Sequence, residues 1–211
     1  MSKENNMHKA LVFIPDISGF TQFSHNTDIV LGKHIIKELL HCIIDSNFLN
    51  LKISEIEGDA VLFYRYGKVP EINTVLIQYE NMLINFKRKL HDLNVRFQTK
   101  IDLSLKLIVH YGPVLEYRLN KFKKLYGDVV VESHILLKNS IKSRNYVLFT
   151  KEAILGSVKP ESNVPLPEWI TMGSLTLKRK GMDDISFSYY EYNLNRLRPN
   201  VIMQEKSFKI S

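Results

Sequence analysis

The chain has 211 residues, of which 45% are hydrophobic and 24% charged, which excludes a disordered chain, a collagen-like chain and a disulfide scaffold. Its single cysteine, Cys42, excludes an intrachain disulfide and a cysteine-based zinc site. Lys and Arg outnumber Asp and Glu by 29 to 22, which favours an anionic partner such as a nucleotide, a nucleic acid or an acidic lipid. No apolar run approaches the ~20 residues of a membrane span and no signal-peptide pattern is present, so we expect a cytoplasmic protein.

The first half of the chain predicts a strand, a helix, a hairpin and a second helix. Residues 9–15 form a short apolar run that ends at a proline, which is typical of a buried strand. Apolar residues at spacings of three and four predict helices over 28–47 and 70–93. Between them, 50–56 and 60–66 are predicted strands joined by a tight turn at Glu57-Gly58-Asp59.

The second half predicts more strands than helices. Residues 100–111 alternate like a strand with one buried face, and we expect 113–119 to pair back on it after a turn at Gly112. Helices over 128–141 and 151–155 flank a strand at 145–149, and a proline-rich loop follows at 159–167. A last hairpin joins 173–180 to 185–193. We therefore expect a single domain over 1–193 and a basic C-terminal tail over 194–211.

The predicted order of elements indicates a fold class. It begins β-α-β-β-α-β, which is the ferredoxin-like or split βαβ arrangement. We expect an α+β fold whose antiparallel or mixed sheet carries helices on one face.

Two aspartates are the first candidate functional residues. Asp16 ends the first predicted strand, and Asp59 lies at the tip of the first hairpin. In a split βαβ sheet these segments are neighbours, so we expect the carboxyl groups within about 6 Å of each other. Paired carboxylates with no basic neighbour suit Mg²⁺ or Mn²⁺. Taken singly, each could instead be a turn or hairpin residue.

The segment after Asp16 is a candidate for binding phosphate. Gly19 lets the backbone bend closely between strand and helix. The backbone amides there could then face a polyphosphate at a helix N-terminus. These amides belong to Ser18, Gly19, Phe20 and Thr21.

Several segments resemble the catalytic domain of class III nucleotidyl cyclases, the adenylate and guanylate cyclase superfamily. In chain order they are Asp16–Thr21, Gly58-Asp59, His110-Tyr111-Gly112, Gly127–Val130 and Lys178–Gly181. The likeness covers residues 9–193, and the stretches ISEIEGDAVLFYR and SHILLKNS resemble an uncharacterised bacterial branch, a domain of unknown function.

The resemblance implies a nucleoside triphosphate bound with two divalent ions, Mg or Mn. Asp16, Asp59 and the Ile17 carbonyl match the metal ligands. The ions would activate the ribose 3′-hydroxyl for attack on the α-phosphate.

The resemblance also implies contacts to the rest of the nucleotide. Lys180 matches the family's triphosphate-binding lysine. Glu55 and Lys124 match its two purine-contacting positions. A carboxylate at Glu55 would accept hydrogen bonds from guanine, whereas Lys124 fits neither the adenylate nor the guanylate pattern, and Glu55 could equally be a surface strand residue.

The third predicted helix departs from the family pattern. The family's asparagine and arginine, which stabilise the transition state, are matched by Val131 and Ile135. Neither side chain donates a hydrogen bond, and losing one preorganised donor costs about 10²–10³ in rate. Because the family's sites take metal ligands from one chain and this pair from the other, a homodimer of this chain would lack the pair at both sites.

Three hypotheses follow. The first is a domain that binds a triphosphate and metal with weak or lost cyclisation, as a sensor or as a homodimer or heterodimer partner. The second is an active, divergent cyclase in which Arg118 or Arg144 supplies positive charge. The third is a non-enzymatic interaction or RNA-binding domain with a ferredoxin-like fold, although the aromatic pattern for stacking bases is absent. We expect no membrane partner and no nucleic acid.

Overall fold

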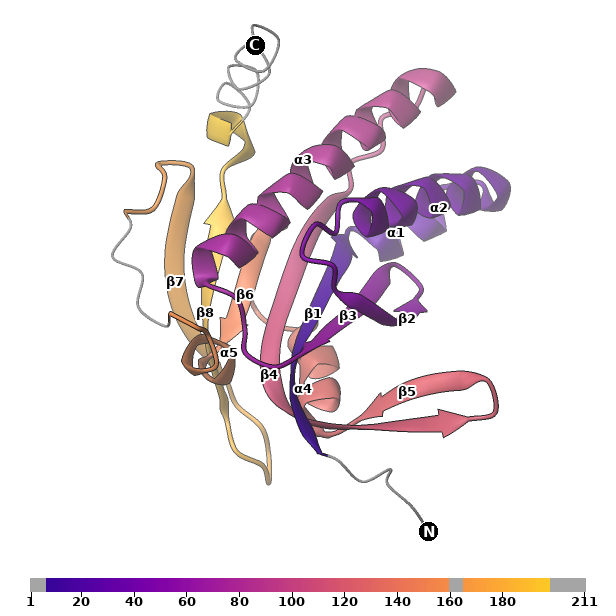
Figure 1. The fold of residues 1–211 in the computed structure, drawn as a ribbon. Helices are drawn as coiled ribbons and strands as arrows, with labels where there is room; N and C mark the ends of the chain where they lie inside the picture. The colour runs from indigo at the N-terminus through magenta and orange to yellow at the C-terminus, as the bar shows by residue number, and fades with distance from the viewer. Residues whose placement is uncertain (1–6, 160–164, 198–211) are drawn as a thin grey trace, which may run out of the picture.

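A computed structural model describes residues 7–159 and 165–197 (Figure 1). The strands are β1 (His8–Ser18), β2 (Lys52–Glu57), β3 (Ala60–Tyr66), β4 (Ser104–Leu119), β5 (Phe122–Tyr126), β6 (Tyr146–Thr150), β7 (Ile170–Leu177) and β8 (Ile185–Tyr192). The helices are α1 (Phe20–Asn26), α2 (Ile29–Asp45), α3 (Ile72–Phe97), α4 (Asp128–Leu136) and α5 (Lys151–Leu155).

The strands of the described ranges form one eight-stranded mixed sheet. Its order is β2-β3-β1-β4-β6-β8-β7, and β5 pairs with β4 off this path. β1 is central and pairs antiparallel with β3 and β4, whereas β4 and β6 run parallel. The continuous apolar run of β1 suits this place, because the strand is buried on both faces. The α+β fold class expected from the sequence is confirmed.

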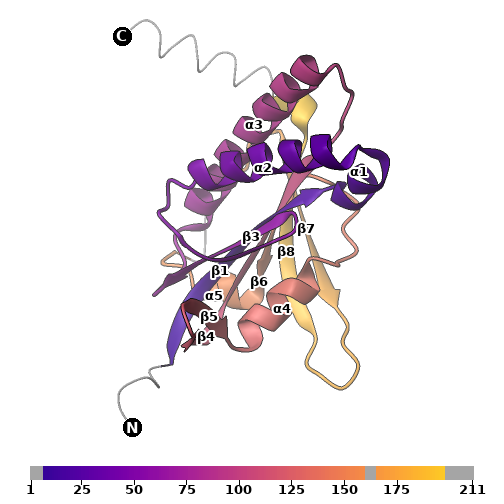
Figure 2. The same cartoon turned by 90° about the vertical axis from the view of Figure 1, so that its right-hand side faces the viewer.

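Helices cover both faces of the sheet. α2 and α3 pack on one face, where side chains such as Phe13 and Tyr79 form the larger core. α4 lies on the other face, where Val129 and Leu136 pack against Val12 and Ile108 (Figure 2). The expectation of helices on one face is therefore wrong. Strands apolar on both faces need cover on both.

The expected turn at Gly112 is also wrong. β4 continues through this position for 16 residues and turns back at Asn120, whose φ is +55°, into β5. The two strands form an arm that extends from the body (Figure 1). The glycine has a packing reason instead, since a Cβ at Gly112 would lie 3.1 Å from Cβ of Val129. Gly112 therefore lets α4 approach the sheet.

Other elements follow the sequence with shifted ends. α2 begins one residue after Asp28, whose carboxylate accepts hydrogen bonds from the backbone amides of Val30 and Leu31 at 3.0 Å, an N-cap. The separate α1 was not expected, and α4 ends at Leu136 rather than at residue 141.

Leu197 is buried against the core, while 198–211 of the expected tail and 160–164 of the loop lie outside the described residues. Within the described ranges, no helix is long and apolar enough to span a bilayer.

Candidate functional site

Asp16 and Asp59 meet where β1 passes the β2–β3 hairpin. The Asp16 position pairs with Ala60, directly after Asp59, and the Ile17 amide donates to the Asp59 carbonyl at 3.2 Å. Asp16 is buried, with 9% of its surface exposed, and Asp59 is half-buried. The antiparallel register of β1 and β3 therefore brings the hairpin tip to the end of β1.

The environment of Asp59 opposes its negative charge. Burial, together with the charge of Asp16 and a hydrogen bond between the two side chains, raises the pKa of Asp59 to about 7. The Lys106 charge acts in the opposite direction on this pKa. Two carboxyl groups this close favour sharing a proton or a cation.

Lys106 is a basic neighbour that the sequence analysis missed. It lies directly across from Asp16 in the β1–β4 register, and its Nζ is 2.8 Å from Asp16 Oδ2. The same ammonium donates to the Leu137 carbonyl at the end of α4, at 3.0 Å. The expectation of a carboxylate pair without a basic neighbour is therefore wrong. The only signal was a lone charge in the apolar run LSLKLIV, since strand register cannot be read from that run.

The loop from Ser18 to Thr21 is held in place by Arg144. Gly19 has φ +94°, and a Cβ there would lie 2.6 Å from the Arg144 Nη2. That nitrogen donates to the Ser18 carbonyl at 3.2 Å, while Nη1 pairs with Asp102 at 2.7 Å. Phe20 is the first residue of α1, and Thr21 is exposed. Arg144 therefore holds this segment through the Ser18 carbonyl and Asp102, and its guanidinium is not a free cation.

Glu55 and Lys124 lie together, although 69 residues separate them. Lys124 on β5 forms an ion pair with the Glu55 carboxylate on β2. His134 Nε2 of α4 lies 4.0 Å from the other Glu55 oxygen. The Glu55 side chain is therefore a paired group, and it is not the free surface carboxylate that its strand position also allowed.

Lys180 lies at the opposite end of the sheet from the acid pair. Asp16, Lys106, Tyr146 and Glu191 share one row across β1, β4, β6 and β8. The β7–β8 turn directly precedes Ile185, the first residue of β8, which is six residues from Glu191. Six residues of strand span about 20 Å. A single copy therefore does not bring the exposed Lys180 to Asp16 and Asp59.

Val131 and Ile135 are also separate from the acid pair. They line a pocket of about 540 Å³ between α4 and the β7–β8 turn. Arg179 lines the same pocket and pairs with Glu132 at 2.8 Å. Glu132 also bonds the buried His110 at 2.8 Å. The sequence analysis did not single out Arg179, while Arg118 lies exposed on the β4–β5 arm.

The donor set at the acid pair suits a hard cation. Two carboxylates and neighbouring backbone carbonyls offer only oxygen, the ligand type of Mg²⁺ and Mn²⁺. Among the described residues, no group of three or more Asp, Glu, His or Cys side chains is placed to hold a metal ion. An ion bound at the acid pair would therefore need further oxygen ligands, as phosphates and water supply. The residues therefore fit a metal carried in with a phosphorylated ligand.

The mixed sheet and its helices have a class III nucleotidyl cyclase-like fold. The guanylyl cyclase Cya2 superposes with a TM-score of 0.69 at 12% identity, over 90% of this chain and 96% of Cya2. The adenylyl cyclase CyaB from P. aeruginosa gives 0.62 at 15% identity, over 89% and 95%. A class III adenylyl cyclase-like ATP-binding protein from Pseudomonas aeruginosa gives 0.60 at 15% identity, over 72% and 35%.

The chain belongs to the family described as protein of unknown function DUF2652, whose profile matches residues 36–146. The uncharacterized protein Rv2561/Rv2562 of Mycobacterium tuberculosis (strain ATCC 25618 / H37Rv) is 27% identical over 120 residues, which cover 54% of this chain and 56% of the relative. The chain thus spans about half the length of this curated relative.

Proposed function

We propose that residues 1–193 form one nucleotide-binding domain that holds a nucleoside triphosphate with Mg²⁺ or Mn²⁺ and cyclises it weakly or not at all. The meeting of Asp16 with Asp59 at the end of β1 carries this proposal. A solved neighbour of the same fold is described as a class III adenylyl cyclase-like ATP-binding protein, and this description supports the proposal of a nucleotide-binding domain.

In this proposal each group at the acid pair has a separate task. Asp16, Asp59 and the Ile17 carbonyl would hold two divalent ions, and these ions would supply charge stabilisation for the attacking and leaving oxygens. Lys106 pairs with Asp16, and its ammonium would also be a donor for phosphate oxygens of a bound nucleotide. The backbone from Ser18 to Thr21, which Arg144 braces at the Ser18 carbonyl, would lie beside the phosphates.

The opposite ends of the molecule complete the nucleotide site only in a dimer. Lys180 would reach the triphosphate from a second copy, and Glu55 with Lys124 would contact the purine. Val131 and Ile135 would face the ribose and the α-phosphate without a hydrogen-bond donor. Ground-state binding survives this loss, whereas interactions specific to the transition state do not. We therefore expect turnover lower than that of an intact site by several powers of ten.

Calorimetric titration with GTP and ATP in Mn²⁺ tests the proposal. We expect the natural chain to bind at least one triphosphate, Asp59→Ala to abolish Mn²⁺-dependent binding, and mass spectrometry to find little cyclic nucleotide. Asp92→Ala, which removes an exposed carboxylate from α3, is the matched control and should bind as the natural chain does. Failure of the natural chain to bind any triphosphate overturns the proposal.

One observation favours the second hypothesis, an active divergent cyclase. Arg179 lies in the pocket of Val131 and Ile135, with 13% of its side chain exposed. A guanidinium there could stabilise charge that the missing arginine would otherwise meet. Robust cyclisation by the natural chain that is lost in Arg179→Gln would favour this alternative. The RNA-binding hypothesis receives no such support, because helices cover both faces of the sheet.

A further inference from the structure

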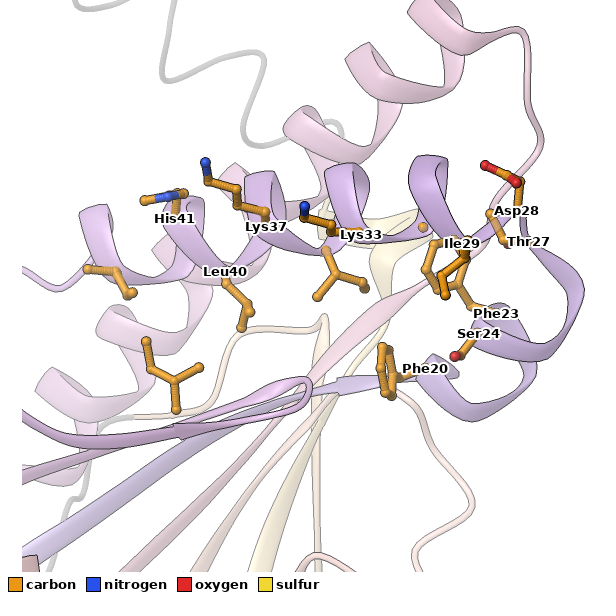
Figure 3. Close-up of a pocket in the computed structure, with 14 residues that line it drawn as sticks. Phe20, Phe23, Ser24, Thr27, Asp28, Ile29, Lys33, Lys37, Leu40 and His41 are labelled. Atoms are coloured by element: carbon orange, nitrogen blue, oxygen red, sulfur yellow. The ribbon is translucent and has the colours of Figure 1, made fainter.

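A groove of about 590 Å³ runs between α2 and the β2–β3 hairpin. Its walls come from α1, from one side of α2, and from Ile56 of β2. Figure 3 shows Phe20 and Leu40 lying toward the space between α2 and the hairpin. This volume is within the range of roughly 300–1,000 Å³ that small-molecule sites occupy.

The groove is apolar and partly open to solvent. Its apolar side chains include Ile29, which is 83% exposed, and Ile56, which is 49% exposed. Phe20, Ile36, Leu40 and Ile44 form its floor and are themselves only partly buried. Large aliphatic side chains exposed around one hollow mark a surface that gains free energy when an apolar group covers it.

One edge of the groove is basic. Lys33, Lys37 and His41 follow one another at four-residue spacing along α2, and Figure 3 shows them in a row. Neither lysine has an ion-pair partner among the residues that the structure describes. The one acidic side chain of the lining, Asp28, is engaged in capping α2. The edge therefore presents unneutralised positive charge beside an apolar floor.

We propose that this groove binds an amphipathic anion, of which a free long-chain fatty acid is the simplest. The acyl chain lies on the floor of the groove, where each buried methylene contributes about 0.8 kcal/mol. The carboxylate lies at the α2 edge, between the ammonium groups of Lys33 and Lys37. A neutral lipid would contact only the apolar floor of the groove, and inorganic phosphate would contact only the lysines at its edge.

The position of the groove couples this ligand to the acid pair. Phe20 is four residues after Asp16, and Ile56 is three residues before Asp59. A chain lying against both side chains would restrain the two segments that carry the carboxyl groups. The binding itself does not depend on a nucleotide site, so it can be tested whether or not triphosphate binds.

Fluorescence titration with cis-parinaric acid, below the concentration at which it forms micelles, measures binding directly. We expect saturable binding that palmitate displaces and that hexanoate and hexadecanol displace at least tenfold less well. Gly32→Leu should weaken binding at least tenfold by filling the groove, because Gly32 lines it and a Cβ there meets only ordinary contacts, the nearest 3.8 Å away. Gly32→Ala is the matched control and should keep the natural affinity.

A charge variant tests the edge of the groove. Lys33→Glu with Lys37→Glu should weaken palmitate binding about tenfold, while Lys138→Glu with Lys142→Glu makes the same charge change on the far side of the sheet and should leave it unchanged. Equal affinity for hexadecanol and palmitate overturns the proposal, as does an unchanged affinity in Gly32→Leu.

Two further measurements identify other occupants. Sedimentation velocity in which Gly32→Leu alone dissociates a dimer would assign the groove to a second copy of the chain. Binding to phosphatidylglycerol vesicles without binding of monomeric fatty acid would assign it to a membrane surface. Either result overturns the proposal of a free amphipathic anion.

Discussion

Lys106 is the residue whose place most changes the chemistry of the acid pair. Its ammonium lies 2.8 Å from Asp16, with 19% of its side chain exposed. A partly desolvated ammonium there offsets one negative charge, as a bound cation would. Removing one member of such a pair leaves an uncompensated charge, which costs more than an exposed ion pair contributes.

Lys106→Met should therefore lower the stability of the fold while it raises the affinity for metal. We expect the variant to lose about 1–3 kcal/mol of unfolding free energy in EDTA, because the buried Asp16 side chain loses its ion-pair partner. We expect Mn²⁺ to bind several-fold more tightly, because no ammonium competes for Asp16. Urea unfolding and titration with Mn²⁺ measure the two effects. Lys106→Arg should retain the natural stability, and weaker Mn²⁺ binding by Lys106→Met would contradict this role.

Asp59 should make the fold less stable as the pH rises. Its pKa is about 7 in the folded chain, against 3.8 without perturbation. Between these values the folded state holds a proton that the unfolded state has released. The contribution of this carboxyl group to stability is therefore full below about pH 4 and is lost as the pH rises to about 7. Asp59→Asn removes this decline. At pH 8 in EDTA the variant should gain about 1–2 kcal/mol over the natural chain, allowing for solvent screening of a half-buried carboxyl.

Urea unfolding at pH 4.5 and pH 8 measures this difference. Asp92→Asn, at an exposed position on α3, controls for a general effect of charge. An equal gain from Asp59→Asn at both pH values would contradict the raised pKa.

At the scale of elements, α4 depends on a close approach to β4. The approach is possible because Gly112 has no side chain at the point where Val129 packs. Gly112→Ala should cost about 1–3 kcal/mol, because its Cβ would be 3.1 Å from that of Val129 in a dense core. Val129→Ala makes a cavity when alone. Combined with Gly112→Ala it removes the γ-methyl contacts at 3.4 and 3.8 Å and gives the new methyl group room to shift, although the Cβ contact remains.

A double-mutant cycle by urea unfolding tests this packing. We expect the double variant to be more stable than the sum of the two single losses predicts. Strict additivity would mean that the two residues do not touch, and α4 would then lie elsewhere.

Local sequence patterns predicted most helices and strands, but they did not predict the tertiary contacts that single residues make. The apolar periodicity of α2 and α3 and the run of β1 are properties of neighbouring residues, so the sequence shows them. Gly112 looks like a turn residue in sequence, yet its use is set by Val129, 17 residues away. Likewise, Asp16 and Asp59 were expected to meet because a hairpin follows the first helix, whereas Lys106 was missed because the β1–β4 register is decided by the whole sheet.

At the scale of the whole molecule, the two halves of the proposed site lie apart. Asp16 and Asp59 occupy one end of the central strands, whereas the β7–β8 turn with Lys180 lies at the other, about 20 Å away along β8. Val131 and Ile135 belong to the second group, since their pocket is bounded by that turn. Two copies related by a two-fold axis can bring one group of each copy against the other group of its partner.

Complementation between two inactive chains tests this arrangement. The natural chain keeps Asp16 and Asp59 but lacks the donors for the transition state. A triple variant with Asp59→Ala, Val131→Asn and Ile135→Arg has donors but lacks one of the two proposed metal ligands. We expect each chain alone to form little cyclic nucleotide, whereas their mixture forms one complete site per heterodimer. Turnover measured by mass spectrometry should exceed both backgrounds at least tenfold and fall on dilution as heterodimers dissociate. A triple variant with Lys138→Glu added outside the site should behave as the triple variant does.

Val131→Asn with Ile135→Arg alone, on a chain that retains Asp59, should be active as a homodimer. Turnover per chain in this double variant that does not fall as the dimer dissociates would show that one copy holds both groups.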